Sequence, residues 1–144
     1  MIDRRTGRLW VQGIEIGAHT TADRLEADGW RPSPAGWMLE TTDRRGLAVV
    51  IAARVVGGRV RGFELRYSIR RPAVDANGQE DWEQARKELH DALLREWFAH
   101  DVHDLIYAPP PQPGPLAWHF DWGMARSDVG ARGAVIDVRW VDSD

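Results

Sequence analysis

The 144-residue sequence contains no cysteine, which excludes disulfide bonds and thiolate metal sites and is typical of a reducing compartment. It also has no apolar run close to the ~20 residues that a membrane-spanning helix needs. Its first five residues, Met-Ile-Asp-Arg-Arg, lack the apolar region of a secretory signal. We therefore expect a cytoplasmic protein that does not act at a membrane.

Motifs that carry common enzyme chemistry are absent as well. The sequence has no Walker-type phosphate loop, no glycine-rich dinucleotide turn after a strand and no Gly-x-Ser-x-Gly elbow. Its net charge of −3 argues against general nucleic-acid binding, because such binding depends on clustered cations that neutralise phosphates. We therefore predict no catalytic residue, no cofactor and no nucleic-acid partner.

The charges are distributed unevenly. Residues 44–71 carry eight arginines and a single acid, Glu64, a net charge of +7. Residues 80–104 carry eight acids against Arg86, Lys87 and Arg95, a net charge of −5. This distribution has two interpretations: solvated helix and sheet surfaces that attract each other, or a bipolar surface that steers a charged partner.

Large apolar residues fall at every second position in two C-terminal stretches, residues 116–124 and 134–141. Side chains alternate between faces along a strand, so each stretch is predicted to be a strand with one buried face. A loop through residues 128–133 is predicted to join the two strands. The predicted buried positions are Leu116, Trp118, Phe120, Trp122, Met124, Ala134, Ile136, Val138 and Trp140.

Apolar patterns predict four further strands, at residues 9–16, 37–42, 47–56 and 59–70. The first changes parity near Gly13, which is typical of a bulge. The third is nearly all apolar, which favours a central strand buried on both faces. Gly57 and Gly58 then predict a hairpin turn into the fourth strand.

Two helices are predicted from start and stop signals. The first has Thr20 as its N-cap and ends at Gly29. The second spans residues 82–100, with Asp81 as its N-cap and Gln84 at the capping-box position. Its apolar residues recur at spacings of three and four, which predicts a face that packs against the core.

The resulting order, β-α-β-β-β-α-β-β, predicts an α+β fold. We expect a single domain over residues 1–144, with a mostly antiparallel sheet and two helices packed on one of its faces. Residues 108–115 contain five prolines and are predicted to form a proline-rich internal loop. The other sheet face would carry the polar residues, unless it packs on another chain.

Four polar residues on the predicted C-terminal strands are the candidates for acid–base chemistry or ligand binding: His119, Asp121, Asp137 and Arg139. Glu64 and Arg66 are expected to join them across the sheet. The alternative interpretation is a set of cross-strand ion pairs on a solvated face. Catalysis also needs a concave pocket, which an open sheet face does not provide by itself.

His100 and His103 are the only residues with metal-ligand spacing, beside Asp101 and Asp104. Histidines at a helix C-terminus also interact favourably with the helix dipole. We therefore predict no metal and keep His100 and His103 as an alternative. Most of the eight tryptophans occupy predicted core positions, and Trp10, Trp30 and Trp37 are left as candidate interface anchors.

Two motifs resemble those of a known class of small bacterial α+β proteins. Phe120-Asp-Trp-Gly123, a polar turn and Ile136-Asp-Val-Arg-Trp140 resemble its final hairpin, and a Trp-led acidic helix at 81–97 precedes it. The class includes immunity proteins paired with polymorphic or type VI secreted toxins. The resemblance implies a cytoplasmic inhibitor that binds one cognate protein toxin and occludes its active site.

Charge then suggests which residues bind such a toxin. For a basic toxin the candidates are the acidic residues Glu80, Asp81, Glu83, Glu88 and Asp91. For an acidic toxin they are Arg66, Arg70 and Arg139. Two alternatives stay open: a small enzyme or ligand-binding protein that uses the four polar strand residues, and a structural or regulatory homodimer formed through the open sheet face.

Overall fold

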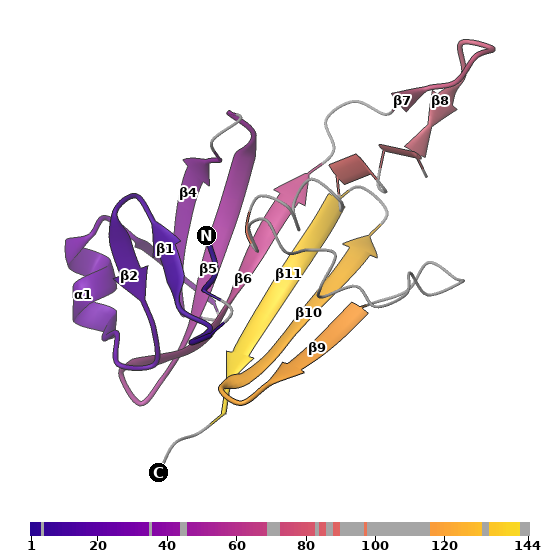
Figure 1. Ribbon diagram of the computed structural model, residues 1–144. Helices are drawn as coiled ribbons and strands as arrows, with labels where there is room; N and C mark the ends of the chain where they lie inside the picture. The colour runs from indigo at the N-terminus through magenta and orange to yellow at the C-terminus, as the bar shows by residue number, and fades with distance from the viewer. Residues whose placement is uncertain are drawn as a thin grey trace.

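A computed structural model describes residues 1–3, 5–34, 36–43, 46–68, 73–82, 84–85, 88–89, 97, 116–130 and 133–141. Its main element is a seven-stranded sheet (Figure 1). In spatial order its strands are β3 (Arg31–Ser33), β4 (Gly36–Thr42), β5 (Ala48–Val56), β6 (Arg59–Ser68), β11 (Gly133–Trp140), β10 (Gly123–Gly130) and β9 (Leu116–Phe120). Every neighbouring pair is antiparallel, which confirms the predicted mostly antiparallel sheet.

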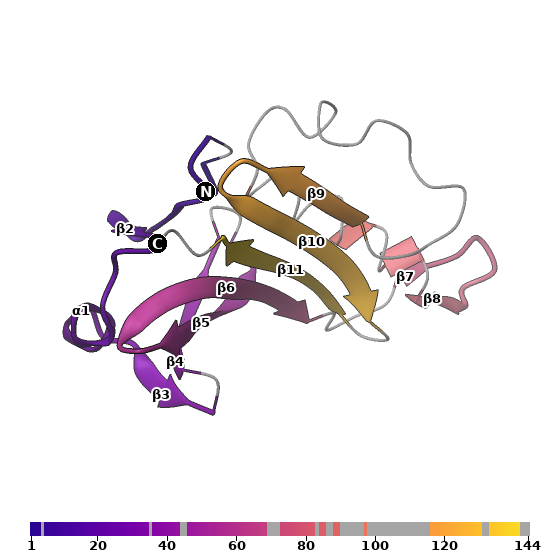
Figure 2. The same ribbon diagram turned by 90° about the horizontal axis from the view of Figure 1, so that it is seen from below.

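Among the described residues, three smaller elements with assigned bounds accompany the sheet. They are the hairpin of β1 (Leu9–Val11) and β2 (Ile14–Ile16), the helix α1 (Ala22–Ala27), and the hairpin of β7 (Ala73–Val74) and β8 (Glu80–Asp81). Figures 1 and 2 show α1 and the β1–β2 hairpin together at one side of the sheet. The β7–β8 hairpin lies away from them, past the end of β6.

The hydrophobic core lies on one face of the sheet. Its sheet residues are Val49, Ile51 and Ala53 of β5, Val60, Phe63, Leu65 and Tyr67 of β6, Ala134, Ile136 and Val138 of β11, and Ala125 of β10. The same cluster contains Leu9 and Ile16 from the β1–β2 hairpin, Leu25 from α1, and Trp97. Each large apolar side chain buried in this way stabilises the fold by about 1.5–3 kcal/mol.

A buried chain of hydrogen bonds connects segments that are far apart in the sequence. The hydroxyl of Tyr67 donates to Asp43 Oδ2 (2.9 Å) and accepts from Trp97 Nε1 (2.8 Å). The carbonyl of Trp97 in turn accepts from the backbone N–H of Ile2. The turn after β4, strand β6, the helical residue Trp97 and the N-terminal segment are therefore held together by satisfied polar groups as well as by apolar packing.

The alternation that predicts β11 is confirmed. Ala134, Ile136 and Val138 are buried, whereas Asp137 and Arg139 lie on the opposite face. Strands β4, β5 and β6 also lie within a few residues of their predicted bounds, and the turn at residues 57–58 connects β5 to β6 as expected.

The predicted strand at residues 9–16 is wrong, because it is a hairpin. Gln12 and Gly13 both have positive φ, 51° and 76°, and reverse the chain between β1 and β2. The change of parity attributed to a bulge is a turn, since positive φ at both central residues is what a two-residue hairpin needs.

Strand β5 is buried on one face, contrary to the prediction of burial on both faces. Val49, Ile51 and Ala53 are buried, while Val50 and Ala52 on the other face are half-buried. The apolar run is misleading because Val50 and Ala52 lie on a face whose other strands carry charged residues.

The predicted strand at residues 116–124 is two strands, because a turn at Asp121 and Trp122 reverses the chain so that Phe120 pairs with Gly123. Met124 pairs with His119 and lies on the polar side, not in the core as predicted. Residues 125–130, partly assigned to a loop, continue β10. Phe120 and Trp122 are half-buried against the core with their rings stacked, while the side chain of Trp118 lies outside the described residues.

The helix predictions are correct in part. In α1 the N-cap is Thr21, whose side chain accepts from the backbone N–H of Arg24, so the predicted Thr20 is one residue early. Asp81 does accept from the backbone N–H of Gln84 (3.0 Å), as an N-cap does, and the Gln84 side chain donates to Glu88. The structure describes six residues of the predicted second helix, and all of them are helical: Trp82, Gln84, Ala85, Glu88, Leu89 and Trp97. Its other residues and the predicted loop at 108–115 lie outside the described part.

Candidate functional site

The face of the large sheet that points away from the core carries most of the candidate site residues. We call this surface the polar face and define its charged centre by Arg54 of β5, Glu64 and Arg66 of β6, Arg126 of β10, and Asp137 and Arg139 of β11. The register places five of them in two neighbouring rows, and Arg66 in a third row with Val50 and Val135. One row runs through Ala52, Glu64, Asp137 and Arg126, and the next through Arg54, Gly62, Arg139, Met124 and His119.

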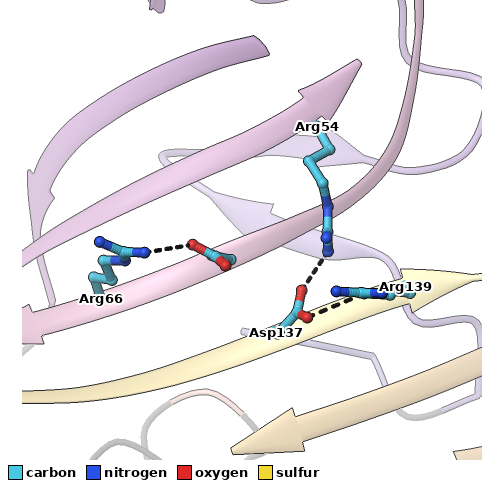
Figure 3. A network of polar contacts seen from close by, with 5 residues as sticks. Arg54, Arg66, Asp137 and Arg139 are labelled. Atoms are coloured by element: carbon cyan, nitrogen blue, oxygen red, sulfur yellow. Dashed lines mark hydrogen bonds and ion pairs between the residues drawn. The ribbon is translucent and has the colours of Figure 1, made fainter. Parts of the chain in front are cut away.

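Ion pairs connect five of these side chains, one pair across strands and two pairs along a single strand (Figure 3). Asp137 is shared: its Oδ1 accepts from Arg54 Nη2, and its Oδ2 accepts from Arg139 Nε at 3.1 Å. Glu64 Oε2 accepts from Arg66 Nη2 at 3.2 Å. Because the Asp137 side chain is only 17% exposed, its charge is largely removed from water and its two arginine partners offset that cost.

The pairing of β6 with β11 explains why arginines gather here. It puts Glu64 directly opposite Asp137, and two like charges in that arrangement repel each other. Four guanidinium groups surround these two carboxylates, so the charged centre carries a net charge of +2. Arg126 lies directly opposite Asp137 on β10, is exposed, and forms no ion pair with a described residue.

Apolar side chains separate the charged ones on the polar face. They include Met38 of β4, Val50 and Ala52 of β5, Met124 of β10 and Val135 of β11, which are half-buried. Methionine and arginine are both enriched at protein interfaces, where apolar contact and directed hydrogen bonds occur together.

The four residues proposed for acid–base chemistry do not come together. Strand β10 lies between β9 and β11, so His119 is about 9–10 Å from Arg139 across the sheet. Asp121 lies in the turn after β9, and both His119 and Asp121 are exposed. Asp137 instead pairs with Arg54 of β5 and with Arg139 on its own strand, and the pair with Arg54 is a cross-strand ion pair as in the alternative interpretation.

The predicted acidic surface is described only in part. Glu80 is exposed on β8, Asp81 caps the helical residues that follow, and Glu88 accepts from the side chain of Gln84. The remaining candidates Glu83, Asp91, Arg70, His100 and His103 lie outside the described residues. Within the described part, no three His, Asp or Glu side chains converge as metal ligands would.

Of the three tryptophans left as candidate interface anchors, one is on the surface. Trp30 is buried and Trp37 is half-buried against the core, whereas Trp10 is 46% exposed on the outward side of the β1–β2 hairpin. Met1 lies beside it, since the backbones of Met1 and Trp10 exchange two hydrogen bonds. This outward side is a second, smaller surface with an exposed aromatic residue.

Sequence reasoning missed Arg54 and Arg126. Arg54 is the one charge in an otherwise apolar strand, and that isolation is a signal that one face of β5 meets polar neighbours. Arg126 falls between the predicted strand at residues 116–124 and the predicted loop at residues 128–133, because the sequence prediction does not contain the turn that starts β10. With β10 placed correctly, two-residue alternation would have put Arg126 on the same face as Met124.

Comparisons with known proteins add nothing to this geometry: no family model, no curated protein and no solved structure matches the chain. No helix among the described residues is both long enough and apolar enough to cross a membrane.

Proposed function

We propose that this protein is a binding module that recognises another protein through the polar face. The observation that carries the proposal is the shared, partly desolvated Asp137 between Arg54 and Arg139, with half-buried methionine and valine side chains around it. An open sheet face of this kind offers arginine anchors and apolar contact area together.

The partner we propose is a cognate protein toxin, which the chain neutralises in the cytoplasm by covering the toxin's active site. The motif resemblance at residues 120–140 supports this identity. Opposite charges on the two surfaces would speed association and suppress binding to non-cognate toxins. We also propose that residues 82–100 form a second helix packed with α1 on the core side, which leaves the polar face available.

An enzyme or ligand-binding protein built on His119, Asp121, Asp137 and Arg139 is the weaker candidate. His119 is separated from Asp137 and Arg139 by a whole strand, and the last two residues already satisfy each other. General acid–base catalysis needs its groups within hydrogen-bonding reach of one substrate, which these positions do not provide.

The test pairs the chain with the toxin candidate encoded by the neighbouring gene in the native genome. Growth rescue on co-expression and a nanomolar complex of the purified proteins are the expected results. The variants Arg66→Glu and Glu88→Lys then locate the contact surface, since an acidic toxin loses affinity for the first and a basic toxin for the second. Absence of both rescue and a complex contradicts the proposed function.

Arg24→Glu is the matched control for Arg66→Glu. Both arginines hold one ion pair and have nearly equal side-chain exposure, 64% and 66%, but Arg24 lies on α1, away from the polar face. Light scattering of the purified chain examines the homodimer alternative. A strict monomer contradicts the homodimer alternative. A dimer that Arg66→Glu dissociates would show that the partner of the polar face is a second copy of the chain and not a toxin.

A further inference from the structure

We infer that Arg126 and Arg139 together form a receptor site for a carboxylate side chain of the partner protein. This inference rests on the proposed function and makes it more specific: the partner's contact surface is acidic at this point.

The register places the two arginines side by side. On the antiparallel pair β10–β11, Arg126 lies opposite Asp137, and Arg139 lies opposite Met124. Arg126 and Arg139 are therefore diagonal neighbours on one face, at a separation of about 7–8 Å that long side chains span. Met124, half-buried, fills the position next to both of them.

Asp137, the carboxylate next to both arginines, is used up by other contacts. Asp137 gives one oxygen to Arg54 and the other to Arg139. Arg139 uses only its Nε in this bond, its side chain is 61% exposed, and Arg126 forms no ion pair within the described part of the chain. Two exposed guanidinium groups therefore lie on one face, with N–H donors available to bind an acceptor.

A protein carboxylate fits this arrangement better than a polyanion. Guanidinium donors bind carboxylates through two parallel hydrogen bonds, and Met124 and Val135 provide apolar contact for the stem of a glutamate or for a neighbouring residue. A nucleic acid needs a longer track of cations, and the chain's net charge of −3 opposes it. With the partner carboxylate bound, positive and negative charges would alternate in the order Arg54, Asp137, Arg139, partner carboxylate, Arg126.

The experiment titrates the full chain with an alternating Glu–Leu octapeptide and follows the Nε–Hε signals of the arginine side chains by NMR. An alternating Lys–Leu octapeptide and inorganic phosphate are the comparison probes. We expect the signals of Arg126 and Arg139 to shift with the Glu–Leu peptide alone. Arg126→Gln and Arg139→Gln should each weaken its binding about tenfold, in line with the loss of a charged hydrogen bond.

Arg5→Gln is the matched control, because Arg5 is exposed and its side chain forms no ion pair with a described residue. Arg126→Lys keeps the charge without the forked donors, so we expect it to bind between the wild type and Arg126→Gln. Urea midpoints of all variants verify that each one is folded.

Three results would overturn the inference: no binding of the Glu–Leu peptide at millimolar concentration, equal binding by Arg126→Gln and Arg5→Gln, or the same shifts with phosphate. These outcomes are separable from those of the toxin assay. Peptide binding without toxin rescue would support the carboxylate site and contradict the proposed toxin partner. Toxin rescue that Arg126→Gln does not affect would support the proposed function and contradict the carboxylate site.

Discussion

Replacement of Gly7 by alanine should destabilise the fold more than any simple backbone effect accounts for. Gly7 is buried, has a φ of +73°, and its carbonyl accepts from Trp140 Nε1 at 3.0 Å. A Cβ added there would come within 2.6 Å of Cδ2 and Cζ3 of the Trp122 ring. Gly7 therefore lies against Trp122, in the turn between β9 and β10, and is bonded to Trp140 of β11.

The expected loss has two components. An L-residue at positive φ costs about 1–2 kcal/mol, and an extra carbon forced into a packed contact costs about 1–3 kcal/mol. Trp122 has little freedom to move away, because its ring stacks on Phe120 with centroids 4.7 Å apart and planes within 9°. We expect Gly7→Ala to lower the free energy of unfolding by about 2–5 kcal/mol in total.

Urea unfolding followed by circular dichroism measures this loss, and Gly13→Ala separates its components. Gly13 has nearly the same φ, +76°, but a Cβ there meets no atom within 4 Å, so only the backbone cost remains. In a Trp122→Ala background, Gly7→Ala should cost no more than Gly13→Ala. Equal losses for Gly7→Ala and Gly13→Ala in the wild-type background would refute the reasoning.

Two further substitutions examine the polar contacts. Asp137→Asn removes the shared charge and leaves its arginines to repel each other, so we expect a loss of about 1–3 kcal/mol that shrinks between 50 and 500 mM NaCl in urea titrations; a salt-independent effect would contradict this. Tyr67→Phe keeps the ring but removes the bonds to Asp43 and Trp97, which should cost about 1–3 kcal/mol. An unchanged urea midpoint for Tyr67→Phe would show that those bonds contribute nothing net.

The sequence predicts a strand correctly where apolar and polar residues alternate along it and only one of its faces packs on the core. In β11 every second residue is apolar and the core lies on one side, so Ile136 and Val138 are assigned correctly. The same rule fails at residues 116–124, because the turn at Asp121 and Trp122 contains no Asn-Gly or Gly-Gly signal and interrupts a pattern that looks continuous. Strand β3 is missed for a related reason: Pro32 reads as a break, yet proline is tolerated at the edge of a sheet.

The candidate site depends on information that periodicity does not contain. Alternation indicates that Glu64 and Asp137 each leave the core face, but not that β11 lies next to β6. That strand order decides that Asp137 meets Arg54 rather than His119. Long-range pairing of this kind is set by the packing of the whole sheet, so the partners of a charged residue follow only from the three-dimensional arrangement.

The pairing of β11 with the central strand β6 has a consequence for biosynthesis. Residues 62–68 of β6 cannot pair with residues 133–139 until the ribosome has added about 65 more amino acids, a delay of roughly 3–13 s at typical elongation rates. During that interval the hydrogen-bonding edge of β6 is open beside Phe63 and Leu65, which is the kind of exposed strand that captures other nascent chains. A chaperone that shields this edge during translation should therefore raise the yield of native protein.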